Sequence, residues 1–246
     1  MRKVIKVGLI PFSGLVGIAV FHLIATNPAE GQQRVKAAAQ RNAAPLKQAL
    51  TEKKSHLGAP VFIRAFKEER ELEVWVQEDD QKTFTLLRTY PIAAASGNLG
   101  PKLAEGDRQV PEGFYHVPPR MMNPRSRFHL AFNIGYPNEF DRSHNRTGSF
   151  IMVHGSDVSI GCLAMTDEKI EEIYTLCDRA HKNGQKFFRV HIFPFRMSEE
   201  KMTAHAESEW LDFWKNLREG YLHFEEKKIP PNVTVKGKRY LFGMDS

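Results

Sequence analysis

Short apolar segments bounded by turn-forming residues fill the chain from residue 61 to residue 193, and they constrain its fold more than any other feature. In one of them Leu72, Val74 and Val76 alternate with other side chains, which is the period of a strand with one buried face. The segments that predict strands are 61–66, 71–76, 84–95, 114–117, 128–134, 150–153 and 187–193. Together they predict a mixed, mainly β domain.

A single long helix is predicted between the last two of these segments. Four apolar residues recur there at helical spacing, a capping residue precedes them and a glycine follows them. The four are Ile170, Ile173, Tyr174 and Cys177, the cap is Thr166 or Asp167, and the glycine is Gly184. The helix is therefore expected to bury one face, with Cys177 on that face as a small core residue.

The pattern changes towards the C-terminus. Residues 198–205 and 208–221 predict two helices, and residues 233–242 predict a short hairpin. The second helix has a wide apolar face, so it is expected to lie over the strand-rich part of the chain. We therefore expect a body over residues 59–194 and a C-terminal helical extension over residues 195–246 that packs on it.

The first 25 residues carry the pattern of an export signal. Arg2, Lys3 and Lys6 precede an apolar stretch over residues 7–25, and basic residues before a hydrophobic run are typical of such segments. The stretch has nearly the length of a membrane-spanning helix and lacks a clean cleavage site. Residues 1–25 are therefore interpreted as a signal peptide or an inner-membrane anchor. Either alternative places the rest of the chain in the periplasm or cell envelope.

The basic charge of the chain is concentrated near its N-terminus. Residues 1–58 hold nine Lys or Arg residues and only Glu30 and Glu52, a net charge of +7, whereas the remainder has a net charge of −1. A nucleic-acid-binding domain carries its charge on the folded part, so no nucleic-acid partner is expected. Residues 26–58 are rich in Ala, Gln and Lys, and they predict a basic, partly helical tether with little to bury.

The residues that carry chemistry lie between His154 and Cys162. An apolar strand ends in His154-Gly155, and a short polar loop then presents Ser159, Gly161 and Cys162. A thiol becomes a useful nucleophile when a base lies beside it, and a histidine at a strand end can be that base. The N–H groups of Gly161 and Cys162 are candidate oxyanion donors. The alternative interpretation is a buried free cysteine near a histidine that is bonded to backbone.

Other common kinds of active site are not indicated. The sequence has no His-Glu-x-x-His spacing, no Gly-x-Ser-x-Gly turn and no phosphate loop, so we expect no catalytic metal, no cofactor and no serine hydrolase site. Two cysteines cannot build a disulfide framework. A Cys162–Cys177 disulfide would block the candidate nucleophile, so both thiols are expected to be free in the active form.

Several further motifs stand in a fixed order around this loop. They are the segments 66–72, 100–102, 105–107, 111–115, 133–138 with Asp141-Arg142, and 194–197. With the His-Gly pair and the Ser-x-Gly-Cys loop, they resemble the YkuD-type L,D-transpeptidases, cysteine enzymes that act on peptidoglycan in the bacterial envelope. More specifically, they are similar to the YafK-like branch of that family. The resemblance covers roughly residues 59 to 225.

The resemblance implies a β-sandwich-like catalytic domain with one helix packed beside the cysteine. It implies that Cys162 is the nucleophile and His154 the general base and acid. Candidate positioning residues are Gly161, Ser159 and Gly155, and candidate substrate-binding residues are Arg142, Tyr136 and Lys102. The implied partners are peptidoglycan stem peptides, attacked at diaminopimelate, and a peptidoglycan-linked lipoprotein.

Two positions beside the cysteine depart from the pattern of many family members. Ile160 stands where many carry His or Arg, and Ala164 stands where many carry Arg; Val110 also replaces a common Thr. The pocket beside Cys162 is therefore expected to be apolar and poor in cations. Three functions stay open: acyl transfer that forms cross-links or attaches a lipoprotein, hydrolysis that releases a lipoprotein from a diaminopimelate–lysine bond, and an inactive peptidoglycan-binding scaffold.

Overall fold

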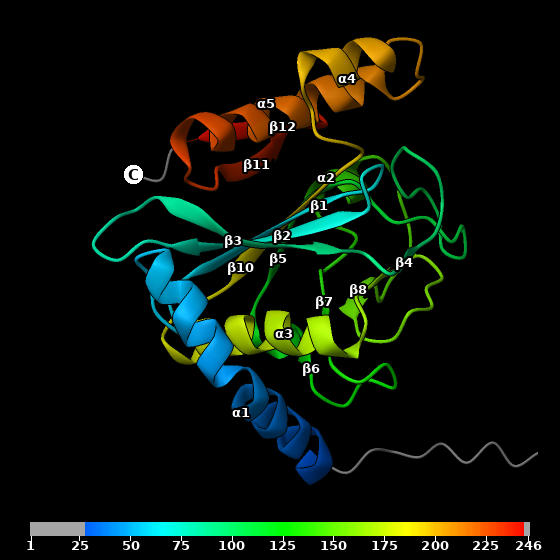
Figure 1. The fold of residues 1–246 in the computed structure, drawn as a ribbon. Helices are drawn as coiled ribbons and strands as arrows, with labels where there is room; N and C mark the ends of the chain where they lie inside the picture. Colours follow the sequence, from blue (N-terminus) through cyan, green and yellow to red (C-terminus); the bar gives the residue numbers. More distant parts are fainter. Residues whose placement is uncertain (1–27, 244–246) are drawn as a thin grey trace, which may run out of the picture.

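The computed structural model describes residues 28–243, so the predicted signal peptide or anchor over residues 1–25 lies outside the described residues. Within residues 28–243 no helix combines the length and the apolar character needed to cross a membrane. Two five-stranded sheets form the body, and a helical layer covers the outer face of the first (Figure 1). The mixed, mainly β class predicted from the sequence is confirmed.

The first sheet has the strand order β3-β2-β1-β10-β5. Its strands are β1 (Val61–Phe66), β2 (Glu71–Gln77), β3 (Phe84–Pro91), β5 (Gly113–Val117) and β10 (Phe188–Phe193). β1 pairs parallel with β10 and antiparallel with β2. Every residue of β1 is buried, because both faces of this sheet are covered.

The second sheet, in the order β4-β9-β8-β7-β6, is built from strands of two or three residues. They are β4 (Ala94–Ala95), β6 (Met122–Asn123), β7 (Ala131–Asn133), β8 (Met152–His154) and β9 (Leu163–Ala164). The predicted strand over residues 84–95 is divided between the two sheets, with residues 92–93 as the crossing point. The predicted strand over residues 128–134 is shorter than expected, because residues 128–130 form a loop.

The helix expected beside the cysteine is α3 (Asp167–Lys182). It contacts β1 of the first sheet and β7 and β8 of the second, so it closes the space between the two sheets. Cys177 is fully buried on its inner face, as predicted. Thr166 takes the N-cap position, but its side chain makes no capping hydrogen bond there.

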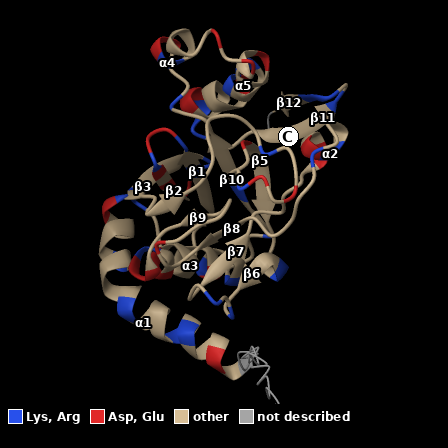
Figure 2. Ribbon diagram, turned by 90° about the vertical axis from the view of Figure 1, so that its right-hand side faces the viewer, with Lys and Arg blue, Asp and Glu red and all other residues tan. Residues whose placement is uncertain are grey.

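Residues 26–58 differ from the expected tether. α1 (Pro28–Glu52) is a long helix that packs along α3, with Val35, Leu46 and Leu50 buried against the core. Basic residues recur along α1 (Figure 2), and one of them, Arg41, binds both carboxylate oxygens of Glu171 on α3, at 2.5 and 2.9 Å. The composition suggested little burial, but a helix gathers its few apolar residues on one face.

The C-terminal extension covers the outer face of the first sheet (Figure 1). It consists of α4 (Glu199–Ala204), α5 (Leu211–Lys227) and the hairpin of β11 (Asn232–Lys236) and β12 (Arg239–Gly243). The hairpin is confirmed, and α5 continues beyond residue 221, where the prediction ended. A short 3-10 helix (Pro119–Met121) and α2 (Glu139–Ser143) were not predicted.

The layer between α5 and the first sheet holds buried charge as well as aromatic rings. Arg64, near the middle of β1 and 2% exposed, pairs with Glu73 of β2 at 2.8 Å and with Glu225 of α5 at 2.6 Å. Its guanidinium lies over the rings of Trp75 and Phe224, at 4.9 and 4.8 Å from their centroids. These buried ion pairs favour one position of α5 on the first sheet, because any other position would leave Arg64 without its partner Glu225.

Candidate active site

The pairing of β8 with β9 brings the predicted catalytic residues to one place. The two strands run parallel, with Val153 opposite Leu163 and His154 opposite Ala164. Cys162 therefore lies just before β9, opposite Met152. Side chains two residues apart along a strand lie on the same face of the sheet, so Met152, His154 and Cys162 share one face. By strand geometry the Cα atoms of His154 and Cys162 are about 8 Å apart, within reach of two side chains that face each other.

The Cys162 thiol lies against the backbone at the start of β8. Its Sγ accepts from the Met152 amide at 3.4 Å and lies 3.8 Å from the Phe150 carbonyl oxygen. Burial raises the pKa of this thiol, whereas the Met152 amide and the charge of Lys102 act in the opposite direction. The resting cysteine is therefore a neutral thiol that requires a base.

His154 is the candidate for that base. Its Nδ1 lies 2.6 Å from the Gly155 carbonyl oxygen, and because a carbonyl only accepts, Nδ1 carries the proton. Nε2 is then left as the basic nitrogen. Burial lowers the pKa of His154, so the ring is neutral near pH 7. Its ring also packs on Phe128, with 4.7 Å between centroids.

Gly155 is required at its position by close packing. A Cβ atom there would lie 2.5 Å from Oδ1 of Asp167 and 2.8 Å from the Phe128 carbonyl oxygen. The Gly155 amide donates to that carbonyl at 3.0 Å, and the next amide, of Ser156, donates to Asp167 at 2.8 Å. The chain after His154 is thus held between the Phe128 loop and the start of α3.

The two candidate oxyanion donors are occupied by hydroxyl groups of the protein itself. The Cys162 amide donates to Ser159 Oγ at 2.9 Å, and the Gly161 amide donates to Ser96 Oγ at 2.6 Å. Gly161 has φ +91°, a conformation that favours glycine. A substrate oxyanion would reach these amides only by replacing the serine hydroxyls as acceptors.

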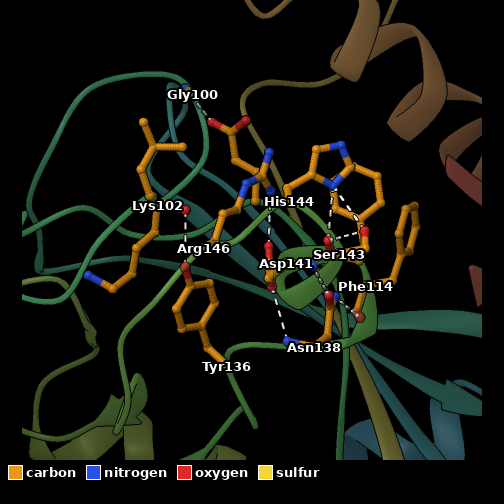
Figure 3. A network of polar contacts seen from close by, with 12 residues as sticks. Gly100, Lys102, Phe114, Tyr136, Asn138, Asp141, Ser143, His144 and Arg146 are labelled. Atoms are coloured by element: carbon orange, nitrogen blue, oxygen red, sulfur yellow. Dashed lines mark hydrogen bonds and ion pairs between the residues drawn. The ribbon is translucent and has the colours of Figure 1, made fainter. Parts of the chain in front are cut away.

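Lys102 and Tyr136, two of the candidate substrate-binding residues, lie together in a buried network (Figure 3). The Tyr136 hydroxyl lies 3.1 Å from the Lys102 carbonyl oxygen, and the Lys102 ammonium donates to Asp107 at 2.5 Å. Both residues are about 5% exposed or less. They therefore shape the loops around the site, and Lys102 adds the charge that acts on Cys162.

Arg142 lies apart from this network. It is exposed on α2, and its guanidinium donates to the Pro137 carbonyl oxygen. The buried member of the same motif is Asp141, which pairs with Arg146 at 2.9 Å and accepts from the Asn138 amide at 3.1 Å (Figure 3). This part of the motif therefore has a structural role, in which Asp141 links Asn138 and Arg146.

Comparison with known proteins assigns this chain to a family. A family model described as YkuD, L,D-transpeptidase catalytic domain, matches residues 60–192, which is more than half of the chain. The chain belongs to the YkuD family. The resemblance inferred from the motifs is confirmed, and membership of a family of L,D-transpeptidases supports a function related to peptidoglycan.

The chain is similar to a curated relative and, at lower identity, to two solved structures. The Escherichia coli (strain K12) protein named "Putative L,D-transpeptidase YafK" is 44% identical over 189 residues, covering 77% of this chain and 76% of that protein. The helical cell shape determining protein Pgp2 from Campylobacter jejuni aligns at TM-score 0.44 and 17% identity, over 78% of this chain and 80% of that one. Bd1075 from Bdellovibrio bacteriovorus aligns at TM-score 0.39 and 21% identity, over 72% and 78% of the two chains.

Sequence reasoning assigned no role at the candidate site to four residues that shape it, although two of them, Lys67 and Glu112, lie within the motif segments 66–72 and 111–115. The four are Lys67, Ser96, Glu112 and Phe128. Glu112 carried a weak signal, because a lone acid within the apolar run from Val110 to Phe114 has to find a buried partner. Ser96 and Phe128 carried none, since their roles depend on contacts with residues far away in the sequence.

Among the described residues no cluster of His, Cys, Asp or Glu could hold a metal ion, and both cysteines are free thiols. The candidate site offers a thiol, an imidazole whose pKa burial lowers, and nearby main-chain amides. Such a set can form and break a thioester. In the described residues no hydrogen bond joins Sγ of Cys162 to the His154 ring.

Proposed function

We propose that the protein is a cysteine acyltransferase that acts on peptidoglycan stem peptides. His154 Nε2 takes the proton of the Cys162 thiol, and the thiolate attacks the carbonyl carbon of the diaminopimelate residue. The C–S bond forms, the C–N bond breaks, and the proton on Nε2 passes to the leaving amine. The product of this half-reaction is a thioester. The observation that carries the proposal is the position of His154 on β8 and of Cys162 just before the parallel neighbour β9, with Nε2 as the basic nitrogen.

An acceptor amine completes the reaction. It gives one proton to His154 Nε2 as its nitrogen attacks the thioester, and Sγ leaves and takes that proton back. The result is a cross-link between stem peptides or the attachment of a lipoprotein. The same thioester with water as acceptor gives hydrolysis.

Hydrolysis at a diaminopimelate–lysine bond, with release of a lipoprotein, is the second candidate. Two large apolar side chains beside the thiol favour it: Ile160 is 75% exposed and Phe150 is 70% exposed. No arginine stands at Ala164, which is fully buried, and Arg142 is held on α2. An apolar rim without an arginine at residue 164 suits a polypeptide leaving group better than a terminal D-alanine carboxylate.

Incubation with purified sacculi, followed by mass analysis of released and newly joined peptides, tests the proposal. Wild-type protein is expected to change the peptide pattern, and Cys162→Ser to abolish the change. Cys177→Ala is the matched control, because Cys177 lies in the core on α3 and its loss is expected to leave turnover intact. A wild-type protein that binds sacculi but joins and releases nothing would support the scaffold alternative.

The ratio of products separates the first two candidates. Efficient cross-linking without release of bound lipoprotein would exclude the hydrolase, and release without cross-linking would exclude the transferase.

We further propose a periplasmic location with the N-terminus in the inner membrane, motivated by the apolar stretch over residues 7–25. The full chain is then expected in the membrane fraction and digestible only from the periplasmic side; recovery from the cytosol would contradict this.

A further inference from the structure

A buried carboxylate joins the C-terminal extension to the loops of the active site. Glu112 is fully buried just before β5. Its Oε1 accepts from the Lys67 ammonium at 2.9 Å and from the Gly100 amide at 2.7 Å, and its Oε2 accepts from the Trp214 indole at 2.8 Å. Three segments distant in sequence therefore meet on one side chain.

Lys67 extends this junction into the loop over residues 96–110. Its ammonium also donates to the Gly100 carbonyl at 2.7 Å and to the Val110 carbonyl at 3.0 Å. Its three protons are thus directed at Glu112 and at both ends of the loop segment 100–110. Gln109 adds a second link, because its amide nitrogen donates to the Gly100 carbonyl at 2.8 Å.

The same loop ends against the residue before the nucleophile. Ser96 Oγ donates to the Arg108 carbonyl at 2.7 Å and accepts from the Gly161 amide at 2.6 Å. The Val110 amide donates to the Ser96 carbonyl at 3.3 Å. The position of Gly161, and with it that of Cys162, therefore depends on the loop that Lys67 and Glu112 hold.

The extension touches this loop at a second point. A Cβ atom on Gly100 would lie 2.5 Å from Nε1 of Trp210, so the residue before α5 packs directly on the Gly100 backbone. Gly100 also has φ +118°, which disfavours any other residue. Trp210 thus packs directly on the Gly100 backbone, and Trp214 is linked to the same backbone through the Glu112 carboxylate.

We propose that Trp214 of the C-terminal helix is a positioning residue for the Cys162 loop, acting through Glu112, Gly100 and Ser96. This inference rests on the proposed role of Cys162 as nucleophile. The extension is then part of the active-site scaffold rather than only a cover for the first sheet. Loss of the indole N–H leaves Glu112 with one partner fewer, loosens the loop over residues 96–110 and displaces the Gly161 amide.

The full chain with Trp214→Phe tests the proposal, because phenylalanine keeps an aromatic ring and removes only the N–H donor and part of the ring system. Turnover is expected to fall about tenfold in kcat with little change in KM, since a small displacement of a nucleophile has an effect of that order. Hydrogen exchange over residues 156–162 is expected to become faster, because the Gly161 amide loses its fixed acceptor, Ser96 Oγ.

Trp75→Phe is the matched control. The Trp75 indole donates to the buried Glu73 carboxylate at 2.8 Å, the same kind of bond, but on β2 and beside Phe224 of α5. A general loss of stability would move both variants alike. The proposal requires slower turnover and faster exchange at residues 156–162 for Trp214→Phe only, and equal effects of the two variants would overturn it.

Ser96→Ala provides a second variant at the other end of the path. The Ser96 side chain is half-buried, so its truncation is expected to leave the protein folded. It is expected to lower kcat, and its combination with Trp214→Phe to be no worse than Ser96→Ala alone, since residues on one path are not additive. Additive losses would overturn the proposal. Hydrogen exchange needs no substrate. It therefore tests the link between Trp214 and the Cys162 loop even if the proposed reaction is wrong.

Discussion

Ser159 binds both main-chain groups of Cys162. Its hydroxyl oxygen accepts from the Cys162 amide at 2.9 Å and donates to the Cys162 carbonyl at 2.6 Å. A single side chain therefore closes the loop around Cys162, the proposed nucleophile, in the way serine closes other local turns. The cysteine is held by its neighbours in sequence before any partner from elsewhere in the fold acts on it.

Replacement of Ser159 by alanine is expected to slow the reaction more than it destabilises the fold. Both main-chain groups of Cys162 would lose their partner, and the loop would no longer hold the thiol near His154. We expect kcat to fall about tenfold or more, with a small change in melting temperature because the loop lies at the surface. Ser159→Thr keeps the hydroxyl and is expected to retain most of the activity. A fully active Ser159→Ala would show that the bond is irrelevant to catalysis.

The charge of Lys102 is expected to set part of the reactivity of Cys162. Burial raises the pKa of this thiol above its ordinary value of 9.0, and Lys102 opposes the increase. In Lys102→Met the pKa is therefore expected to rise further, so that alkylation by iodoacetamide at pH 8 slows about threefold. Cys177 is fully buried, so the reagent reports on Cys162.

Lys182→Met, at the exposed end of α3, is the control for this measurement and is expected to leave the alkylation rate unchanged. An unchanged rate in Lys102→Met would contradict the prediction.

The loss of turnover at low pH is expected to follow the protonation of His154, whose pKa is lowered from 6.5 by burial. Activity is therefore expected to persist below pH 6.5 before protonation of Nε2 removes the base.

His191 is expected to make the fold sensitive to acid. It lies in β10 between the rings of Phe62 and Phe114, and neither ring nitrogen has a hydrogen-bond partner among the described residues. Burial, with the charges of Arg189 and Arg64, lowers its pKa well below 6.5. The unfolded chain binds this proton below about pH 6.5 while the fold does not, so stability is present above that pH and lost below it, by about 1.4 kcal/mol per pH unit.

Thermal unfolding of His191→Leu between pH 7.5 and pH 5 checks this. The variant is expected to lose less stability on acidification than the wild type. Some dependence is expected to remain, since burial also lowers the pKa values of His154 and His116. His56→Gln removes an exposed histidine and is expected to keep the steep dependence. A His191→Leu curve parallel to that of the wild type would rule the explanation out.

α1 is expected to contribute to stability as a packed helix. Leu46 is fully buried, so Leu46→Ala is expected to lower the free energy of unfolding by about 2–5 kcal/mol. Gln48→Ala, two residues along on the exposed side, is expected to change it little. A chain that starts at residue 59 is likewise expected to unfold at a lower temperature than one that starts at residue 28. Equal stability of the two would mean that the helix is only a tether.

The sequence by itself determined the local structure of much of the body. Alternation in residues 71–76 predicted β2, helical spacing from Ile170 to Cys177 predicted α3, and the order of motifs around Cys162 predicted the family. These signals are short-range, because the side-chain period of a strand or helix is visible in a few consecutive residues. The chemical pair His154 and Cys162 was accessible for the same reason, since one strand and one loop contain both residues.

Only the tertiary structure decided which distant residues meet. The docking of α1 through Leu46, the burial of Lys67 in what reads as a charged turn, and the junction of Glu112 with Trp214 all join segments far apart in sequence. A buried charge is tolerated only where a partner of opposite charge or a set of hydrogen bonds meets it, and the local sequence does not name that partner. The fold supplies it, and in this protein the fold thereby links the C-terminal helix to the loop over residues 96–110 through Glu112.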